Sequence, residues 1–136
     1  MILDAIRPPL PIGWPLLPFP DAHGRIDYPD LATSVRQGLE VILSTRPGEQ
    51  LMRPGYGAGL VDFIGEPDTV TTRRRIHDRV TESIGRYEPR VEVSRVDVDA
   101  LPGSSGHLRV EIAYRIRRTG KAHTIGVNLE MEAQKK

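Results

Sequence analysis

Hydrophobic residues recur at two different spacings along this chain, and the change from one to the other falls at Pro89. Before that proline, apolar positions follow each other at intervals of three and four residues, the period of an amphipathic helix. After it they alternate with polar residues, as in a half-buried strand. Proline lacks a backbone N–H and disfavours helical geometry in the preceding residue, so a helix that reaches Glu88 must end there. The chain is therefore predicted to be helical first and β second.

Two helices are predicted in the first part of the chain. The first begins at Pro29 or Asp30 and ends at Ser44-Thr45, and its apolar stripe consists of Leu31, Val35, Leu39, Ile42 and Leu43. Gly38 lies inside this helix and is expected to mark a close crossing. A short helical turn is predicted at Phe63 and Ile64. The second helix begins at Glu66-Pro67-Asp68 and runs to about Gly85, with an apolar stripe of Ile76, Val80, Ile84 and then Tyr87.

Three strands are predicted after Pro89. In the first, Val91 and Val93 alternate in one phase and Val96 and Val98 in the other, so a bulge is expected near Ser94-Arg95. The second carries Leu108, Val110, Ile112, Tyr114 and Ile116; the third runs from Lys121 to Met131 and carries Ile125, Val127 and Leu129. The predicted fold class is α+β, with two amphipathic helices packed on a small antiparallel three-stranded meander.

A proline-rich N-terminal arm is predicted to precede a single domain. The arm covers residues 1–29 and the domain residues 30–136, because 136 residues suffice for one core. Prolines at positions 8, 9, 11, 15, 18 and 20 exclude helix and central strand from the arm. The apolar residues between them favour an extended segment that lies along the domain or a partner, with Trp14 more plausibly a lid over the core than a partner anchor. A turn is expected at Asp21-Ala22-His23-Gly24.

Composition excludes several classes of function. The formal charge is +1, from 19 basic and 18 acidic residues, which argues against a polyelectrolyte-type binder. There is no cysteine for a disulfide, a thiolate nucleophile or a zinc thiolate site. No apolar run approaches the ~20 residues that span a bilayer, and no secretion signal is apparent at the N-terminus. We therefore expect a protein made in the cytoplasm, with no membrane partner.

No pattern of catalytic or metal-binding residues stands out. The histidines at 23, 77, 107 and 123 have no metal-ligand spacing, and neither a metal nor a cofactor is expected. Glycosidase chemistry would have only Glu88 and Glu49 as plausible carboxylates, and Arg90 favours the ionised form of Glu88 over the protonated acid. The basic run Arg73-Arg74-Arg75 is interpreted as a solvated helix face paired with Asp78 and Glu82, in preference to a nucleic-acid site. We expect a protein that is not an enzyme.

Two features remain as candidates for binding. The first is the segment from Arg46 to Leu60, a long glycine-rich loop without the ending of a phosphate-binding loop, and long loops in compact domains tend to be functional. The second is the last strand, residues 121–131, which is expected to leave an open edge that either the arm or another protein's strand covers. A proline at Val127 is predicted to block such strand addition while the domain stays folded.

Three segments together resemble a known family. They are Leu43-Ser44-Thr45-Arg46-Pro47-Gly48-Glu49, Met52-Arg53-Pro54-Gly55-Tyr56-Gly57 and Tyr87-Glu88-Pro89-Arg90-Val91. In order and spacing they resemble the baseplate wedge proteins that initiate the sheath of contractile phage tails, a family that also includes subunits of type VI secretion baseplates and of contractile injection particles. The similarity covers about residues 12–130. Older labels in this family read lysozyme; no residue pattern here supports that label, and Gln50 departs from the arginine common at its position.

The resemblance implies partners and sites. Glu88, Pro89 and Arg90 would dock on the baseplate wedge, and the loop motif would consist of Arg46, Pro47, Gly48, Glu49, Arg53, Pro54, Gly55, Tyr56 and Gly57. The edge strand with Ile125, Val127 and Leu129 would face sheath subunits of the first ring and gain a strand from them. Further implied partners are tail tube or hub proteins, but no nucleic acid, with about six copies per particle assembled in the cytoplasm. The alternatives are a peptidoglycan hydrolase and a small nucleic-acid or regulator-binding module.

Overall fold

The computed structural model describes residues 20–26 and 29–132. The described residues fall into two compact units, one that ends at Gln37 and one that begins at Gly38. Trp14 and most of the predicted arm lie outside the described residues. The predicted turn at Asp21 is confirmed: its Oδ1 accepts hydrogen bonds from the backbone N–H groups of His23 at 2.8 Å and Arg25 at 2.9 Å, and Gly24 has a φ of 75°.

Helix α1 spans Leu31–Ser44, as the apolar stripe predicts. Asp30 caps its start, because its carboxylate accepts a hydrogen bond from the backbone N–H of Thr33 at 2.8 Å. Hydrogen bonds from Thr33 hold the pKa of Asp30 below 3.8. In the second unit, the part of α1 from Gly38 onward buries Leu39, Ile42 and Leu43.

Two further helical segments follow the loop. Helix η1 is a single 3-10 turn, Leu60–Phe63, which begins earlier than the turn predicted at Phe63 and Ile64. Helix α2 spans Val70–Tyr87 and buries Ile76, Val80 and Ile84 completely. It starts later than predicted because the hydroxyl of Thr69, rather than an acidic side chain at 66–68, accepts the capping hydrogen bond from Thr72 at 3.1 Å.

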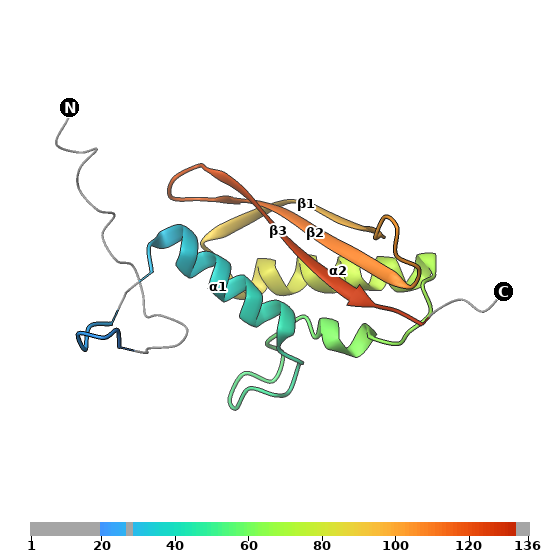
Figure 1. Cartoon of the computed structure of the whole chain (residues 1–136), viewed down its shortest axis with the longest axis horizontal. Coiled ribbons are helices and arrows are strands. Elements are labelled where there is room, and N and C mark those ends of the chain that lie inside the picture. Colours follow the sequence, from blue (N-terminus) through green and yellow to red (C-terminus); the bar gives the residue numbers. More distant parts are fainter. Residues whose placement is uncertain (1–19, 27–28, 133–136) are drawn as a thin grey trace. The chain divides into compact units, whose positions relative to one another are not determined.

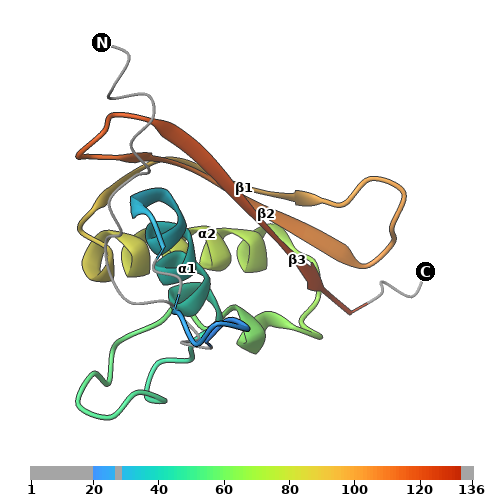
Figure 2. The ribbon, with the colours of Figure 1, turned by 60° about the vertical axis from the view of Figure 1, so that its left-hand side comes forward.

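The strands form one antiparallel meander in the order β1-β2-β3, with bounds Val91–Ala100, His107–Ile116 and Ala122–Glu130. The predicted bulge is confirmed, because the register of β1 against β2 shifts between Val93 and Arg95. Helix α2 and the part of α1 from Gly38 onward lie on the same face of this sheet (Figures 1 and 2). Even-numbered residues of β2 point to that face and are buried. The predicted α+β class, two helices with a three-stranded antiparallel sheet, is confirmed.

Candidate docking corner, loop and sheet edge

The corner at the end of α2 is a tight ion pair within the chain. Helix α2 ends at Tyr87 and Glu88 is its C-cap, as Pro89 requires. The guanidinium of Arg90 donates a hydrogen bond to each carboxylate oxygen of Glu88, from Nε to Oε1 at 2.7 Å and from Nη2 to Oε2 at 2.8 Å. Glu88 is only 5% exposed, whereas the side chain of Arg90 is 38% exposed and Pro89 is at the surface. Hydrogen bonding to Glu88 raises the pKa of Arg90.

Gly38 of α1 makes room for this pair. A Cβ atom at position 38 would lie 2.8 Å from Oε2 of Glu88 and 3.3 Å from Nη2 of Arg90, so a side chain there would force the ion pair to move. The close approach predicted at Gly38 therefore exists, and the group that packs against the helix at this point is the Glu88–Arg90 ion pair. The carbonyl of Arg90 also accepts a hydrogen bond from the N–H of Arg117 at 2.9 Å. The sequence left open whether Glu88 pairs within the chain, and its partner is Arg90.

The first part of the loop motif is a capped turn. The carboxylate of Glu49 accepts a hydrogen bond from the backbone N–H of Arg46 at 3.0 Å, and Gly48 between them has a φ of 93°. The guanidinium of Arg46 reaches Asp62 in η1 at 3.0 Å. Glu49 is thus a local turn-former, which gives it a structural role in place of the catalytic role considered for it.

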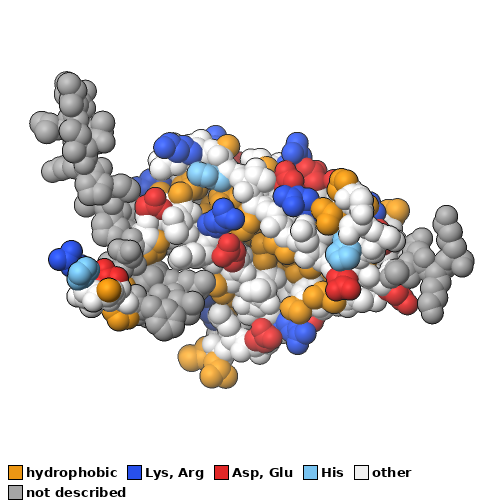
Figure 3. Space-filling model, viewed as in Figure 1, with side chains coloured by type: hydrophobic (Ala, Val, Ile, Leu, Met, Phe, Trp, Pro, Cys, Tyr) orange, Lys and Arg blue, Asp and Glu red, His pale blue; other side chains and the backbone are white. Residues whose placement is uncertain are grey.

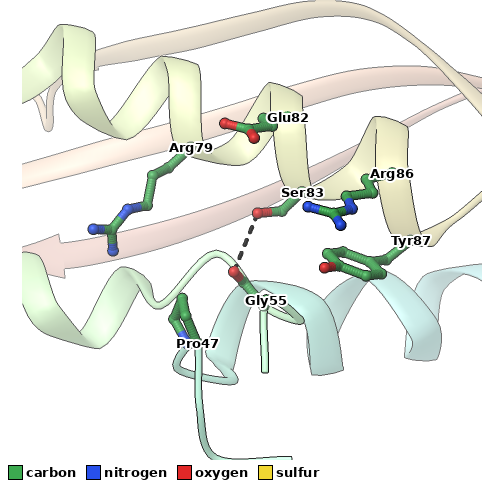
Figure 4. A pocket seen from close by; sticks show the side chains of 8 residues that line it. Pro47, Gly55, Arg79, Glu82, Ser83, Arg86 and Tyr87 are labelled. Carbon is green, nitrogen blue, oxygen red and sulfur yellow. Dashed lines mark hydrogen bonds between the residues drawn. The ribbon is translucent and has the colours of Figure 1, made fainter. Parts of the chain in front are cut away.

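The last part of the loop motif is fixed against both helices. The backbone N–H of Ala58 donates to the carbonyl of Ile42 at 2.8 Å. The hydroxyl of Ser83 in α2 donates to the carbonyl of Gly57 at 3.2 Å (Figure 4). Gly57 has a φ of 110°, and a Cβ there would collide with the carbonyl of Thr45, so only glycine fits. The glycines of this loop thus set its path over the helix ends.

Two tyrosines join the loop to the end of α2. The rings of Tyr56 and Tyr87 meet edge to face with centroids 5.1 Å apart. The guanidinium of Arg53 lies 4.3 Å from the centre of the Tyr56 ring and 5.4 Å from that of Tyr87, and Arg86 lies 5.3 Å from that of Tyr87. Burial raises the pKa of Tyr56 above 10.0. Motifs far apart in sequence therefore meet in one cluster beside the corner.

Sequence reasoning missed the tip of the loop. Leu51 is 93% exposed and Met52 is 98% exposed, and Met52 adopts the left-handed backbone conformation with a φ of 67°. The available signal was two adjacent large apolar residues, Leu51-Met52, in an otherwise polar loop. Positive φ is uncommon for a residue other than glycine and costs free energy.

The peptide groups of β3 fall into two sets. Ile116 donates to the carbonyl of Lys121 at 3.0 Å, and Met131 donates to the carbonyl of Gly106 at 2.6 Å. Bonding alternates along an antiparallel ladder, and the register between these two pairs is unbroken. Odd-numbered residues of β3 therefore direct their N–H and C=O groups to β2, whereas Ala122, Thr124, Gly126 and Asn128 direct theirs outward.

The residues predicted to form the edge, Ile125, Val127 and Leu129, are thus on the edge strand but bond inward to β2. Ile125 and Leu129 are buried and Val127 is half-buried. The predicted effect of a proline at Val127 rested on a donor at the open edge, but that N–H belongs to the β2–β3 ladder, so the variant is expected to weaken the sheet itself. The outward hydrogen-bonding groups, which have no backbone partner among residues 20–26 and 29–132, lie at the even-numbered positions between them.

The two edges of the sheet differ in how they are protected. The outer side of β3 is closed after Asn128, where Glu130 accepts a hydrogen bond from Gly65 at 3.1 Å and Glu132 donates to Glu66 at 3.0 Å. From Ala122 to Asn128, β3 carries no Asp, Glu, Lys or Arg. The β1 edge instead has a bulge and the charged residues Glu92, Arg95, Asp97 and Asp99, features that discourage strand addition.

Two of the three arginines in the basic run of α2 are paired within the chain, but not with the predicted partners. Arg73 binds Asp68 through two hydrogen bonds, at 2.7 and 2.9 Å, and Arg75 binds Glu66 at 3.0 Å. The expected partners Asp78 and Glu82 were wrong because Asp68 and Glu66, just before the helix, lie within reach. Among residues 20–26 and 29–132, no group of three or more His, Cys, Asp or Glu could hold a metal ion.

Comparison with known proteins places this small α+β fold in a family of baseplate components. The chain belongs to the family described as baseplate wedge protein gp25, whose sequence model matches residues 29–121. A search among curated proteins finds no match. In the described part of the chain, no helix is both long and apolar enough to cross a membrane.

Three solved structures are similar to this chain. The first, from the baseplate of the anti-feeding prophage, has 33% identity and a TM-score of 0.69 over 76% of this chain and 83% of that one. The second is a Geobacter sulfurreducens protein with a provisional tail-lysozyme name, at 26% identity and a TM-score of 0.69 over 79% and 96%. The third, from the contracted pyocin R2 baseplate, has 25% identity and a TM-score of 0.51 over 82% and 96%. The chain is therefore a structural baseplate component of contractile injection systems.

Proposed function

We propose that this chain is a non-enzymatic sheath initiator, which docks on the baseplate wedge at the corner and templates the first sheath ring by strand addition at β3. The observation that carries the proposal is the row of outward peptide groups at Ala122, Thr124, Gly126 and Asn128 on a stretch without formal charge. Such a row is a ready template for a strand of another chain. The bulge and charges of β1 disfavour the opposite edge.

An apolar groove supports the choice of β3. It has a volume of about 280 Å³ and lies between β3, η1 and the end of α1, with Leu43, Leu60, Ile64, Val127 and Leu129 in its lining. A strand paired with the outward groups would place alternate side chains on the helix-covered face of the sheet. An apolar side chain at one of these positions would fill the groove. The occupant that fits both the ladder and the groove is an amphipathic strand of a sheath subunit.

The corner suits docking because its geometry is fixed before any partner arrives. The hydrogen bonds to Glu88 and Arg117 hold Arg90 beside Gly38. Part of the Arg90 side chain, 38% exposed, and Pro89 remain accessible to a partner. A preorganised contact loses little conformational entropy when a partner binds. Wedge proteins are the proposed partners, and assembly in the cytoplasm is part of the same proposal.

A proline at Thr124 tests the strand-addition proposal. Thr124 is exposed and its N–H faces outward, so Thr124→Pro removes a donor from the open edge and none from the β2–β3 ladder. We expect Thr124→Pro baseplates to contain the variant chain but to carry no sheath, as seen by electron microscopy of particles from a complemented deletion strain. Thr124→Val, which keeps the donor, is the matched control. Sheath on Thr124→Pro baseplates would refute strand addition at this edge.

The structure argues against Glu88 as the catalytic acid of the alternative function, a peptidoglycan hydrolase. Both oxygens of Glu88 accept hydrogen bonds from Arg90, and the group is 5% exposed, so the carboxylate is engaged within the chain and has little access for a substrate. Glu49 caps a turn in the loop. The proposed function is therefore assembly without catalysis, in spite of the provisional name of one similar protein.

A further inference from the structure

The loop between α1 and η1 presents an apolar tip on a rigid base. Leu51 and Met52 are almost fully exposed, and hydrophobic side chains project from the loop in the space-filling view (Figure 3). The base is held by Gly57 and Ala58, whose backbone groups are bonded to α2 and α1. Adjacent exposed apolar residues on a fixed support are typical of an interface, and methionine adapts well to irregular partner surfaces.

Two arginines without carboxylate partners lie at the same base. Arg53 and Arg86 contact the tyrosine pair, and neither forms an ion pair with any described residue. Arg46, Arg73, Arg75 and Arg90 each have an acidic partner within 3.0 Å. Stacking on the rings of Tyr56 and Tyr87 restrains both guanidinium groups, so binding a carboxylate would cost little further side-chain entropy.

A shallow cleft runs between the loop and helix α2. Its volume is about 160 Å³, and its lining includes Pro47 and Gly55 from the loop and Ser83, Arg86 and Tyr87 from α2. In Figure 4, Arg86 and Tyr87 extend from α2 on the side where Gly55 passes. A Cβ at Gly55 would lie 2.7 Å from the hydroxyl of Tyr87, so the loop can pass this close only as glycine. The cleft has room for one side chain of a partner.

We propose that the loop tip and the two arginines form one interface, which binds a protein segment with an Asp or Glu carboxylate next to apolar residues. The carboxylate would lie between Arg53 and Arg86, and the apolar residues against Leu51 and Met52. A nucleic-acid backbone could satisfy the arginines but would leave the apolar tip in water, so a protein segment is the better fit. Arg86 and Tyr87 directly precede the corner, so the partner is a component of the baseplate rather than of the sheath.

Photocrosslinking in assembled baseplates tests this proposal. A benzophenone amino acid replaces Met52 in the full chain, expressed in a producing strain that lacks the native copy, and purified baseplates are irradiated and analysed by mass spectrometry. We expect a cross-link to a baseplate protein at a peptide with Asp or Glu within about four residues of an apolar contact, one turn of helix. A cross-link to nucleic acid, to a second copy of this chain or to a peptide without a carboxylate would overturn the proposal, as would no cross-link at all.

Charge reversal provides the energetic test. Arg53→Glu and Arg86→Glu should each reduce incorporation into baseplates by about tenfold or more, because like charges would face each other across the interface. Arg74→Glu, an exposed arginine on α2, and Glu82→Gln, which removes a negative charge from the cleft lining, should incorporate at the parental level. Replacing the cross-linked Asp or Glu of the partner with lysine should restore the incorporation of the Arg86→Glu variant into baseplates. Equal incorporation of the Arg86 and Arg74 variants, both with the parental melting temperature, would refute the proposal.

This inference rests on membership of the baseplate family and on the proposed docking of the corner, but not on strand addition. In Thr124→Pro baseplates, which are expected to lack sheath, the cross-link from position 52 should persist. Its disappearance there would assign the partner to the sheath and overturn the proposed baseplate contact. Sheath on Thr124→Pro baseplates with the cross-link intact would refute only strand addition.

Discussion

Removing the guanidinium of Arg90 should destabilise the isolated chain as well as weaken docking. Arg90→Ala leaves the Glu88 carboxylate, 5% exposed, without the group that engages both of its oxygens. Breaking a fully buried ion pair in this way costs roughly 3–5 kcal/mol. Because the side chain of Arg90 is itself 38% exposed, water can replace part of the lost contact, so we expect a loss of about 2–3 kcal/mol.

This loss is measurable in the purified chain by urea unfolding. At about 4 °C per kcal/mol for a chain of this size, it corresponds to a melting temperature about 8–12 °C lower. A domain with an unfolding free energy of about 5–15 kcal/mol would remain folded at 25 °C, so incorporation into baseplates can be measured on the same variant. Sequence analysis treated Arg90 as a docking residue, and the intrachain pair adds a role in the stability of the isolated chain.

A double-mutant cycle separates the pair from its surroundings. Glu88→Gln keeps the shape and removes the charge, and the coupling between Arg90→Ala and Glu88→Gln should be at least about 1 kcal/mol. An unfolding free energy for Arg90→Ala within about 0.5 kcal/mol of the parent, the usual range for surface substitutions, would refute the argument. Stability near the parental value with lost incorporation would mean that Arg90 acts only on the partner.

Two further predictions concern the scaffold. Gly38→Ala should destabilise the chain by about 1–3 kcal/mol although alanine favours helix, because the new Cβ would displace Glu88; thermal unfolding measures this, and a stabilised variant would contradict the described geometry. The hydrogen bonds from Arg73 hold the folded pKa of Asp68 below 3.8, so the pair's contribution of about 1 kcal/mol is present above that pH and lost as pH falls through the folded value. The stability difference between the parent and Asp68→Asn should therefore shrink below pH 3.8, and a difference that grows on acidification would contradict this sign.

Much of the fold follows from local pattern. The stripe Leu39, Ile42 and Leu43 predicts where α1 lies, Pro89 predicts where α2 ends, and the phase change after Val93 predicts the bulge. Each of these depends on neighbours in sequence and on one rule of backbone geometry. The start of α2 was predicted too early, because the acidic residues at 66–68 also match the pattern of a helix start, whereas the residue that caps the helix is Thr69.

The sites depend on pairings that a linear pattern does not contain. The Glu88–Arg90 ion pair lies against Gly38 only because α1 and the corner meet in the fold. Arg73 pairs with Asp68, and not with Asp78, because of the path that the chain takes just before α2. The direction of each peptide group in β3 follows from the registration of Ile116 with Lys121, which alternation of side chains cannot supply. For the same reason, Arg53 and Arg86, remote in sequence, could not be recognised as neighbours.

The closure of β3 by Gly65 and Glu66 bears on how faithfully a ring could be started. The outward groups run only from Ala122 to Asn128, and the carbonyl of Glu130 is already bonded to Gly65. A strand that adds here would meet a stop after about seven residues, or roughly 23 Å. A slip of one residue turns every side chain to the opposite face, so an end stop selects one register over its neighbours. The short segment after η1 would then fix the register of each added strand, so every sheath subunit of a first ring would have the same height and rotation.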